Sequence, residues 1–195
     1  MITSGGKVLR VIRVVLIGSL IGVLPTVGYM QVDSTLLRRV SCFSLGVVAG
    51  MHGSDAGMGV EATSSPFLRK SLSVRVRGGL NWLESYKSLT GENMTYPSLA
   101  AAIVYQTPVA NRIRFYIETG FFVLLPSDEF SNRSSVPGFS SSAGVELFAR
   151  YKRELMISYF FGGGLAVCDA KAEKLESQPD YGDGFLFTNG LRFYF

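Results

Sequence analysis

The sequence predicts an all-β protein in which eight antiparallel strands form an up-and-down β-barrel behind an N-terminal signal peptide. Three observations support this fold class. Apolar and polar residues alternate with a period of two over most of the chain after position 42, which is the period of a β-strand. The connections between the alternating segments are mostly short and long in turn. Only 17% of the 195 residues are charged while 12% are aromatic, a composition that excludes a disordered chain.

The first 28 residues have the features of a secretory signal peptide. Basic residues occur within the first 13 positions, and an uncharged segment follows at 14–30, with its apolar core ending at Pro25. We expect cleavage after Gly28, which leaves 29–195 as the barrel domain; an uncleaved membrane anchor is the alternative. No run of about 20 apolar residues follows position 30, which excludes a helical membrane protein with several spans.

The strand segments follow from the alternation in chain order. The clearest is 71–82, whose even positions are apolar or glycine and whose odd positions are polar or glycine. Several segments have about 11 to 13 residues, more than a strand of a soluble sheet needs and enough for a tilted strand to cross a bilayer. The alternation predicts strands at 42–52, 57–63, 71–82, 97–106, 112–123, 142–150, 154–165 and 185–195.

The connections indicate which strand ends share a rim. Short connections are expected at 107–111 and 151–153, and longer polar ones at 84–95, 125–138 and 168–183. With an even number of strands, both termini and the short turns fall on one rim and the long loops on the other, as in outer-membrane barrels. The first connection, at 53–56, is short where this scheme expects a long one.

The polar face of the strands is expected to line the barrel interior, which makes the barrel a transmembrane one. That face is rich in glycine and serine, which suit a narrow lumen, whereas all lysines after position 28 fall in expected turns and loops. Its charges are arginine and glutamate, which form dense ion pairs in a tight interior. The lumen residues so predicted are Glu61, Arg75, Arg77, Arg114, Glu118, Glu146, Arg150, Glu154 and Arg192.

The last six residues, Gly-Leu-Arg-Phe-Tyr-Phe at 190–195, resemble the terminal strand of bacterial outer-membrane β-barrels. In size and strand number the mature chain is similar to the small OmpA, OmpX and OmpW type. This resemblance implies a bacterial outer-membrane location with lipid around the barrel. It also implies that the barrel-assembly machinery reads Phe193 and Phe195, and that the surface loops are available to an extracellular ligand.

Three functions stay open for such a barrel. The favoured one is a structural or surface-interaction role, with a lumen filled by side chains. The second is a narrow channel for small solutes, hydrophobic ones included, which the OmpW-type resemblance implies. The third assumes the opposite arrangement, in which a secreted soluble barrel carries a ligand against an inward apolar face.

An enzymatic role has little support in the sequence. His52 and Ser54 match the spacing of the histidine–serine pair of outer-membrane lipid A deacylases, and Glu61 is the nearby acid, but the position in the chain and the spacing to the acid depart from that family. No cofactor or metal motif is recognised. Removal of the three basic residues of the leader reduces the formal charge from +4 to +1, and no basic stripe remains, which excludes a nucleic-acid partner.

Overall fold

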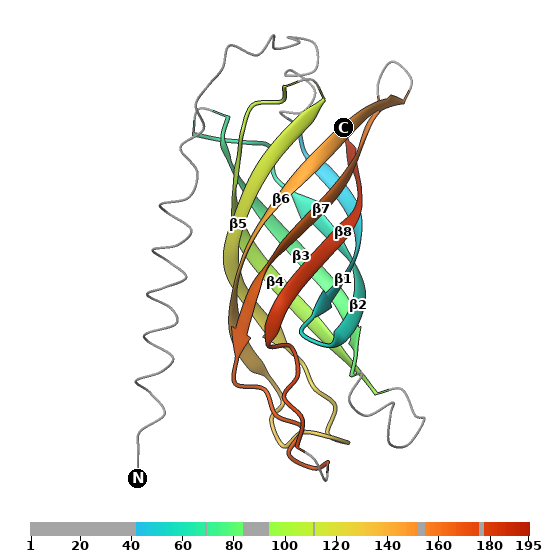
Figure 1. Ribbon diagram of the computed structural model, residues 1–195, viewed down its shortest axis with the longest axis vertical. Helices are drawn as coiled ribbons and strands as arrows, with labels where there is room; N and C mark the ends of the chain where they lie inside the picture. The colour runs from blue at the N-terminus through green and yellow to red at the C-terminus, as the bar shows by residue number, and fades with distance from the viewer. Residues whose placement is uncertain (1–41, 69, 84–93, 111, 152–154, 176–177) are drawn as a thin grey trace. The chain divides into compact units, whose positions relative to one another are not determined.

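In the computed structural model the described part of the chain is a closed antiparallel barrel of eight strands (Figure 1). The structure describes residues 42–68, 70–83, 94–110, 112–151, 155–175 and 178–195, so the expected signal peptide lies outside it. Among these residues no helix is long and apolar enough to cross a membrane. The strands are β1 (Ser44–His52), β2 (Asp55–Thr63), β3 (Leu72–Trp82), β4 (Thr95–Gln106), β5 (Ile113–Leu124), β6 (Val136–Tyr151), β7 (Leu155–Cys168) and β8 (Gly184–Tyr194).

The barrel closes because β1 pairs with β8 as well as with β2. The paired positions can be followed from strand to strand, starting at Ser44 on β1 and ending at Gly184 on β8. In the β1–β8 register Gly184 would lie opposite position 54, so one circuit of the barrel displaces the register by ten residues. Such a stagger requires strands that are steeply tilted against the barrel axis. The tilt is visible in Figure 1. Side chains that meet across the lumen therefore come from distant sequence positions.

The two faces of the strands are inverted relative to a soluble barrel. The outward face carries Leu, Val, Ile, Met and Phe, with Phe121 72% and Val60 63% exposed. All charged side chains that the structure describes within the strands are on the inward face, where most are buried. The alternative of a soluble barrel with an apolar interior is therefore wrong in its geometry, because the apolar face points outward.

The strand boundaries differ most from the sequence-based ones at β6. We expected a loop at 125–138 and a strand from 142, whereas β6 begins at Val136 and pairs with β5 there. In the sequence Pro137 and Gly138 suggest a turn. In the structure Pro137 pairs with β5, but the pairing of β6 with β7 begins only at Gly138, so Pro137 has no β7 residue opposite it. Proline is tolerated there because it has no ladder hydrogen bond to donate.

The β1–β2 turn, the last residue of β3 and the connections that follow β5 and β7 lie at one end of the barrel, which we call the loop end. Gly53 in the β1–β2 turn has a φ of +62°, and its amide donates a 2.8 Å hydrogen bond to the carbonyl of Phe185. An added Cβ at Gly53 would lie 2.3 Å from the carbonyl oxygen of Asp183. The short first connection is therefore compact enough for the β7–β8 connection to pack against it.

Candidate functional site in the barrel lumen

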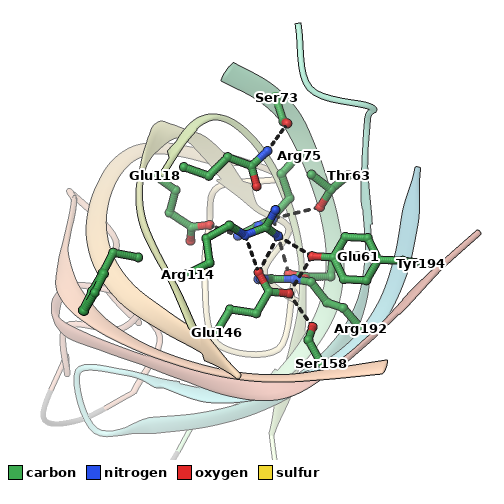
Figure 2. Close-up of polar contacts among 12 residues, drawn as sticks. Glu61, Thr63, Ser73, Arg75, Arg114, Glu118, Glu146, Ser158, Arg192 and Tyr194 are labelled. Atoms are coloured by element: carbon green, nitrogen blue, oxygen red, sulfur yellow. Dashed lines mark hydrogen bonds and ion pairs between the residues drawn. The ribbon is translucent and has the colours of Figure 1, made fainter. Parts of the chain in front are cut away.

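Seven of the nine predicted lumen residues meet in one ion-pair network in the barrel interior. Figure 2 shows all of them except Arg77 with labels. They come from five strands that alternation alone does not bring together. The network contains Glu61 on β2, Arg75 and Arg77 on β3, Arg114 and Glu118 on β5, Glu146 on β6, and Arg192 on β8. Among the described residues no cluster of His, Cys, Asp or Glu could hold a metal ion.

Glu61 is the centre of one half of the network. Its Oε2 accepts hydrogen bonds from Nη2 of Arg77 at 2.9 Å and from Nε of Arg77 at 3.2 Å. Its Oε1 accepts from Nε of Arg192, which comes from the last strand. The side chain is 1% exposed, so both oxygens are satisfied by guanidinium groups and not by bulk water. Charge-assisted bonds of this kind are stronger than neutral ones.

Glu118 extends this half of the network toward β5. Its carboxylate is paired with Nη1 of Arg75, and Nη2 of Arg77 lies 3.4 Å from its Oε1. The Nε of Arg75 donates a 3.0 Å hydrogen bond to Oγ1 of Thr63. Arg75 and Arg77 are therefore held by different combinations of the same carboxylates.

Glu146 is the centre of the other half. Arg114 donates to its Oε2 from Nη2 at 2.5 Å and from Nε at 3.1 Å. Oε1 accepts from the hydroxyl of Tyr194 at 2.6 Å and from the hydroxyl of Ser158. The arrangement satisfies a fully buried carboxylate, which would be very costly to leave unpaired.

Arg192 joins the two halves. Its Nε bonds to Glu61, and its Nη1 lies 3.3 Å from Oε2 of Glu146. The guanidinium lies over the ring of Phe160, 3.7 Å from the ring centroid, and 5.3 Å from that of Tyr116. Neither Nη atom has a hydrogen-bond partner. Arg192 is therefore held partly by aromatic faces, which attract a desolvated cation.

The inward aromatic residues were not identified from the sequence. Tyr116, Phe148, Phe160 and Tyr194 point into the lumen and lie against the arginines. The predicted lumen residues were all arginine or glutamate, so these four aromatic residues were not among them. They could have been identified from their place in the alternation, because they fall on the same face of their strands as the arginines, glutamates and glycines.

Two further predicted lumen residues are not described, and the terminal phenylalanines lie outside the lumen. The side chain of Arg150 and the whole of Glu154 lie outside the described residues. Phe195 is 64% exposed beyond the end of β8, and its amide donates a 3.1 Å hydrogen bond to the carbonyl of Phe43. Phe193 shares the outward register of Leu191 on β8.

The residues of the enzyme alternative are not brought together. Glu61 pairs in register with Gly46, six residues before His52 on β1, which corresponds to about 20 Å along the strand. Both of its oxygens are engaged by arginines. His52 stacks on Phe122 with ring centroids 6.0 Å apart, and Ser54 lies exposed in the turn.

At the loop end, two connections pack into a small apolar cap that the sequence analysis did not predict. Its aromatic residues are Tyr96, Phe130 and Tyr181, with centroids 5.1 Å apart for the two tyrosines and 5.4 Å for Phe130 and Tyr181. The Tyr96 hydroxyl donates a 2.7 Å hydrogen bond to the buried carboxylate of Asp55, which also accepts from the amide of Gly182 at 3.2 Å. Burial raises the pKa of the Tyr181 hydroxyl, which keeps it neutral.

Ion pairs and backbone hydrogen bonds fix the connections of the cap on its solvent side. Arg133 contacts Asp169 and Glu173 of the β7–β8 connection, and its Nη1 donates to the carbonyl of Asp169 at 2.9 Å. The amide of Lys174 donates to the carbonyl of Phe130 at 3.1 Å. The β5–β6 and β7–β8 connections therefore form one packed unit and not independent loops.

Comparisons with known proteins found likeness among solved structures and none among family models or curated proteins. Among solved structures, the N-terminal β-barrel domain of OprF from Pseudomonas aeruginosa is similar, with a TM-score of 0.46 and 13% sequence identity; the match covers 80% of this chain and 98% of that one.

Proposed function

We propose that this chain is an integral outer-membrane β-barrel protein whose role is structural or involves interactions at the cell surface. The observation that carries the proposal is the inverted distribution of side chains. A ring of exposed aliphatic and aromatic residues surrounds the described strands, whereas buried arginines and glutamates fill the interior. In water such a surface would be a large aggregation hazard, whereas in lipid it is the required one.

The closed lumen supports a structural or surface role over transport. The ion-pair network spans the interior, and the apolar cap packs at the loop end. The cap would present an ordered surface, with Arg133, Lys171 and Glu173 on it, to an extracellular ligand. The proposal includes a secretory signal peptide at 1–28 and recognition of Phe193 and Phe195 by the barrel-assembly machinery.

The first test is the electrophoretic mobility of the detergent-purified protein in SDS, with and without boiling. Closed barrels without free strand edges stay folded in SDS until they are heated, so we expect two bands of different mobility. Cell fractionation should place the same heat-modifiable band in the outer membrane. A protein that is soluble without detergent and shows no mobility shift would contradict the proposal.

A second candidate function is a narrow path for small solutes. It is favoured by the way in which Arg77 is shared between Glu61 and Glu118, because a cation with two partners can exchange between them. Single-channel recordings in planar bilayers separate the two functions. A folded barrel without conductance would exclude the channel, and discrete openings would exclude a lumen that only supports the fold.

We also propose that the barrel has no enzymatic role on lipid A. The separation of Glu61 from His52 along the barrel supports this. Lipid A from cells that express the protein, its His52→Ala variant or its Ser54→Ala variant should be identical by mass spectrometry. Removal of an acyl chain by the original protein but not by the variants would overturn the proposal.

A further inference from the structure

A small cavity with polar and apolar lining residues lies in the lumen between the ion-pair network and the loop end. Its volume is about 40 Å³, which exceeds the roughly 10–15 Å³ that one water molecule needs. Inward glycines of β1, β2 and β3 leave this space open: Gly50, Gly57, Gly59 and Gly79 are among its walls. The polar side chains in its lining are His52, Arg77, Asn81, Ser98 and Thr188.

The network beside the cavity carries an excess of positive charge. Four guanidinium groups face three carboxylates, so the formal charge is +4 −3, or +1. Both Nη atoms of Arg192 are buried without a hydrogen-bond partner among the described residues, although Nη1 lies 3.3 Å from Oε2 of Glu146. An uncompensated buried charge is costly, and a counter-ion relieves the cost.

No other acid of the described strands supplies the missing charge. Asp55 lies six residues from Glu61 along β2, or about 20 Å, and its carboxylate accepts hydrogen bonds from Tyr96 and Gly182.

The cavity adjoins the most accessible cation of the network. The side chain of Arg77 is 18% exposed, whereas those of Arg75, Arg114 and Arg192 are at most 5% exposed. Its Nε and Nη2 donate hydrogen bonds to the carboxylates of Glu61 and Glu118, whereas its Nη1 donates to neither.

The remaining polar groups of the lining can donate hydrogen bonds. The Ser98 oxygen accepts from Nδ2 of Asn81 at 3.0 Å, so its own O–H is left to donate. The buried hydroxyl of Thr188 is a second donor, and the Nδ1 of His52 is buried without a partner. No acidic residue is among the described lining residues. The cavity therefore combines a cation with neutral donors, which is the chemistry of an anion site.

We propose that this cavity binds one small anion of halide size, with chloride as the physiological example, as the counter-ion of the ion-pair network. Arg77 supplies the charge, and the hydroxyls of Ser98 and Thr188 supply the hydrogen bonds. The volume admits chloride or bromide and excludes an organic anion such as gluconate. The site depends on the closed lumen and not on the cellular location of the barrel.

The test is the midpoint of urea unfolding of the full protein purified in detergent, measured in sodium chloride and in sodium gluconate at equal ionic strength. A ligand that binds only the folded state raises stability in proportion to the logarithm of its concentration above its Kd. We expect the midpoint to rise with chloride and bromide at constant ionic strength. Equal midpoints in chloride and gluconate at every concentration would overturn the proposal.

Variants locate the effect. Arg77→Gln removes the excess charge and should abolish the chloride dependence. Thr188→Val keeps the side-chain volume, removes one donor, and should weaken the apparent chloride affinity about tenfold while the barrel still folds. Ser142→Ala is the control, because it removes a buried lumen hydroxyl that has no hydrogen-bond partner among the described residues and does not line the cavity. An unchanged chloride dependence in Thr188→Val, or an equal loss in Ser142→Ala, would overturn the proposal.

Crystals grown or soaked in bromide provide a second, independent readout. The anomalous signal of bromide should lie beside Arg77, within hydrogen-bond reach of Ser98 and Thr188. A lumen without an anomalous peak at this position would contradict the assignment.

Discussion

The guanidinium of Arg192 lies over the ring of Phe160, with Cζ 3.7 Å from the ring centroid. The two residues come from neighbouring strands, because Phe160 on β7 is paired in register with Gly190 on β8. Gly190 leaves room for the ring: a Cβ at that position would lie 2.9 Å from two Phe160 ring carbons. The last strand therefore supplies the space for the ring as well as the cation that covers it.

Phe160→Leu should lower the free energy of unfolding by about 2 kcal/mol, because a desolvated cation–π contact is worth up to roughly that amount. Phe161→Leu is the matched control, since Phe161 is the next residue and points outward. The measurement is urea unfolding of both variants in lipid vesicles. Equal losses for Phe160→Leu and Phe161→Leu would show that the contact with Arg192 contributes nothing specific.

Glu61→Gln should destabilise the barrel by about 3–5 kcal/mol, the usual cost of breaking a buried ion pair by removing one charge. The loss arises because Arg77 and Arg192 keep their charges but share a neutral partner. Glu129→Gln, in an exposed part of the β5–β6 connection, should change stability by less than about 0.5 kcal/mol. The unfolding midpoints of both variants decide this, and similar midpoints would argue against a stabilising network.

Gly144→Ala should destabilise the barrel by about 1–3 kcal/mol through overpacking. Its Cβ would lie 2.5 Å from the Tyr116 ring and 2.5 Å from the carbonyl oxygen of Phe161. Gly163→Ala, on the outward face, meets nothing closer than 3.4 Å and should be tolerated. The fraction of each variant that keeps the mobility of the folded band in unboiled gels measures the difference; equal fractions would contradict the prediction.

Tyr96→Phe should loosen the cap without unfolding the barrel. It removes a hydrogen bond to the buried carboxylate of Asp55, worth about 1.5 kcal/mol, which corresponds to about tenfold more frequent opening of the cap. The rate of tryptic cleavage after Lys171 and Lys174 should rise by that factor. Tyr105→Phe, at an exposed outward position, should leave the rate unchanged. An unaltered rate in Tyr96→Phe would show that this hydrogen bond does not hold the cap.

Val60→Arg should destabilise the barrel by about 2–4 kcal/mol in lipid if the outward face is embedded in the bilayer. Val60 pairs with Val47 and Gly78, near the middle of their strands, so it is expected to lie near the midplane. Thr95 is the first residue of β4, so Thr95→Arg should lower the free energy of unfolding by at most about 1 kcal/mol. Equal costs at both positions would mean that the outward face is not in contact with hydrocarbon.

The sequence by itself was enough to determine the all-β class, the eight strands and the face to which most strand residues belong. Alternation carries this information because successive side chains of a strand point to opposite faces, whatever the strand pairs with. That Arg75, Arg77 and Arg114 share one face follows from it directly, and the glycine and serine content of that face indicated that it is the inward one. The start of β6 could not be predicted, because the edge position that tolerates Pro137 exists only once the neighbouring strands are in place.

Only the tertiary structure decided which charges meet. Glu61 and Arg192 are 131 positions apart, and their contact depends on the closure of β1 on β8 and on the ten-residue stagger around the barrel. A change of register by two residues would keep every side chain on its face and yet give each carboxylate a different set of partners. The cavity beside Arg77 and the cap around Tyr181 have the same origin, because both form between segments that only the closed barrel brings into contact.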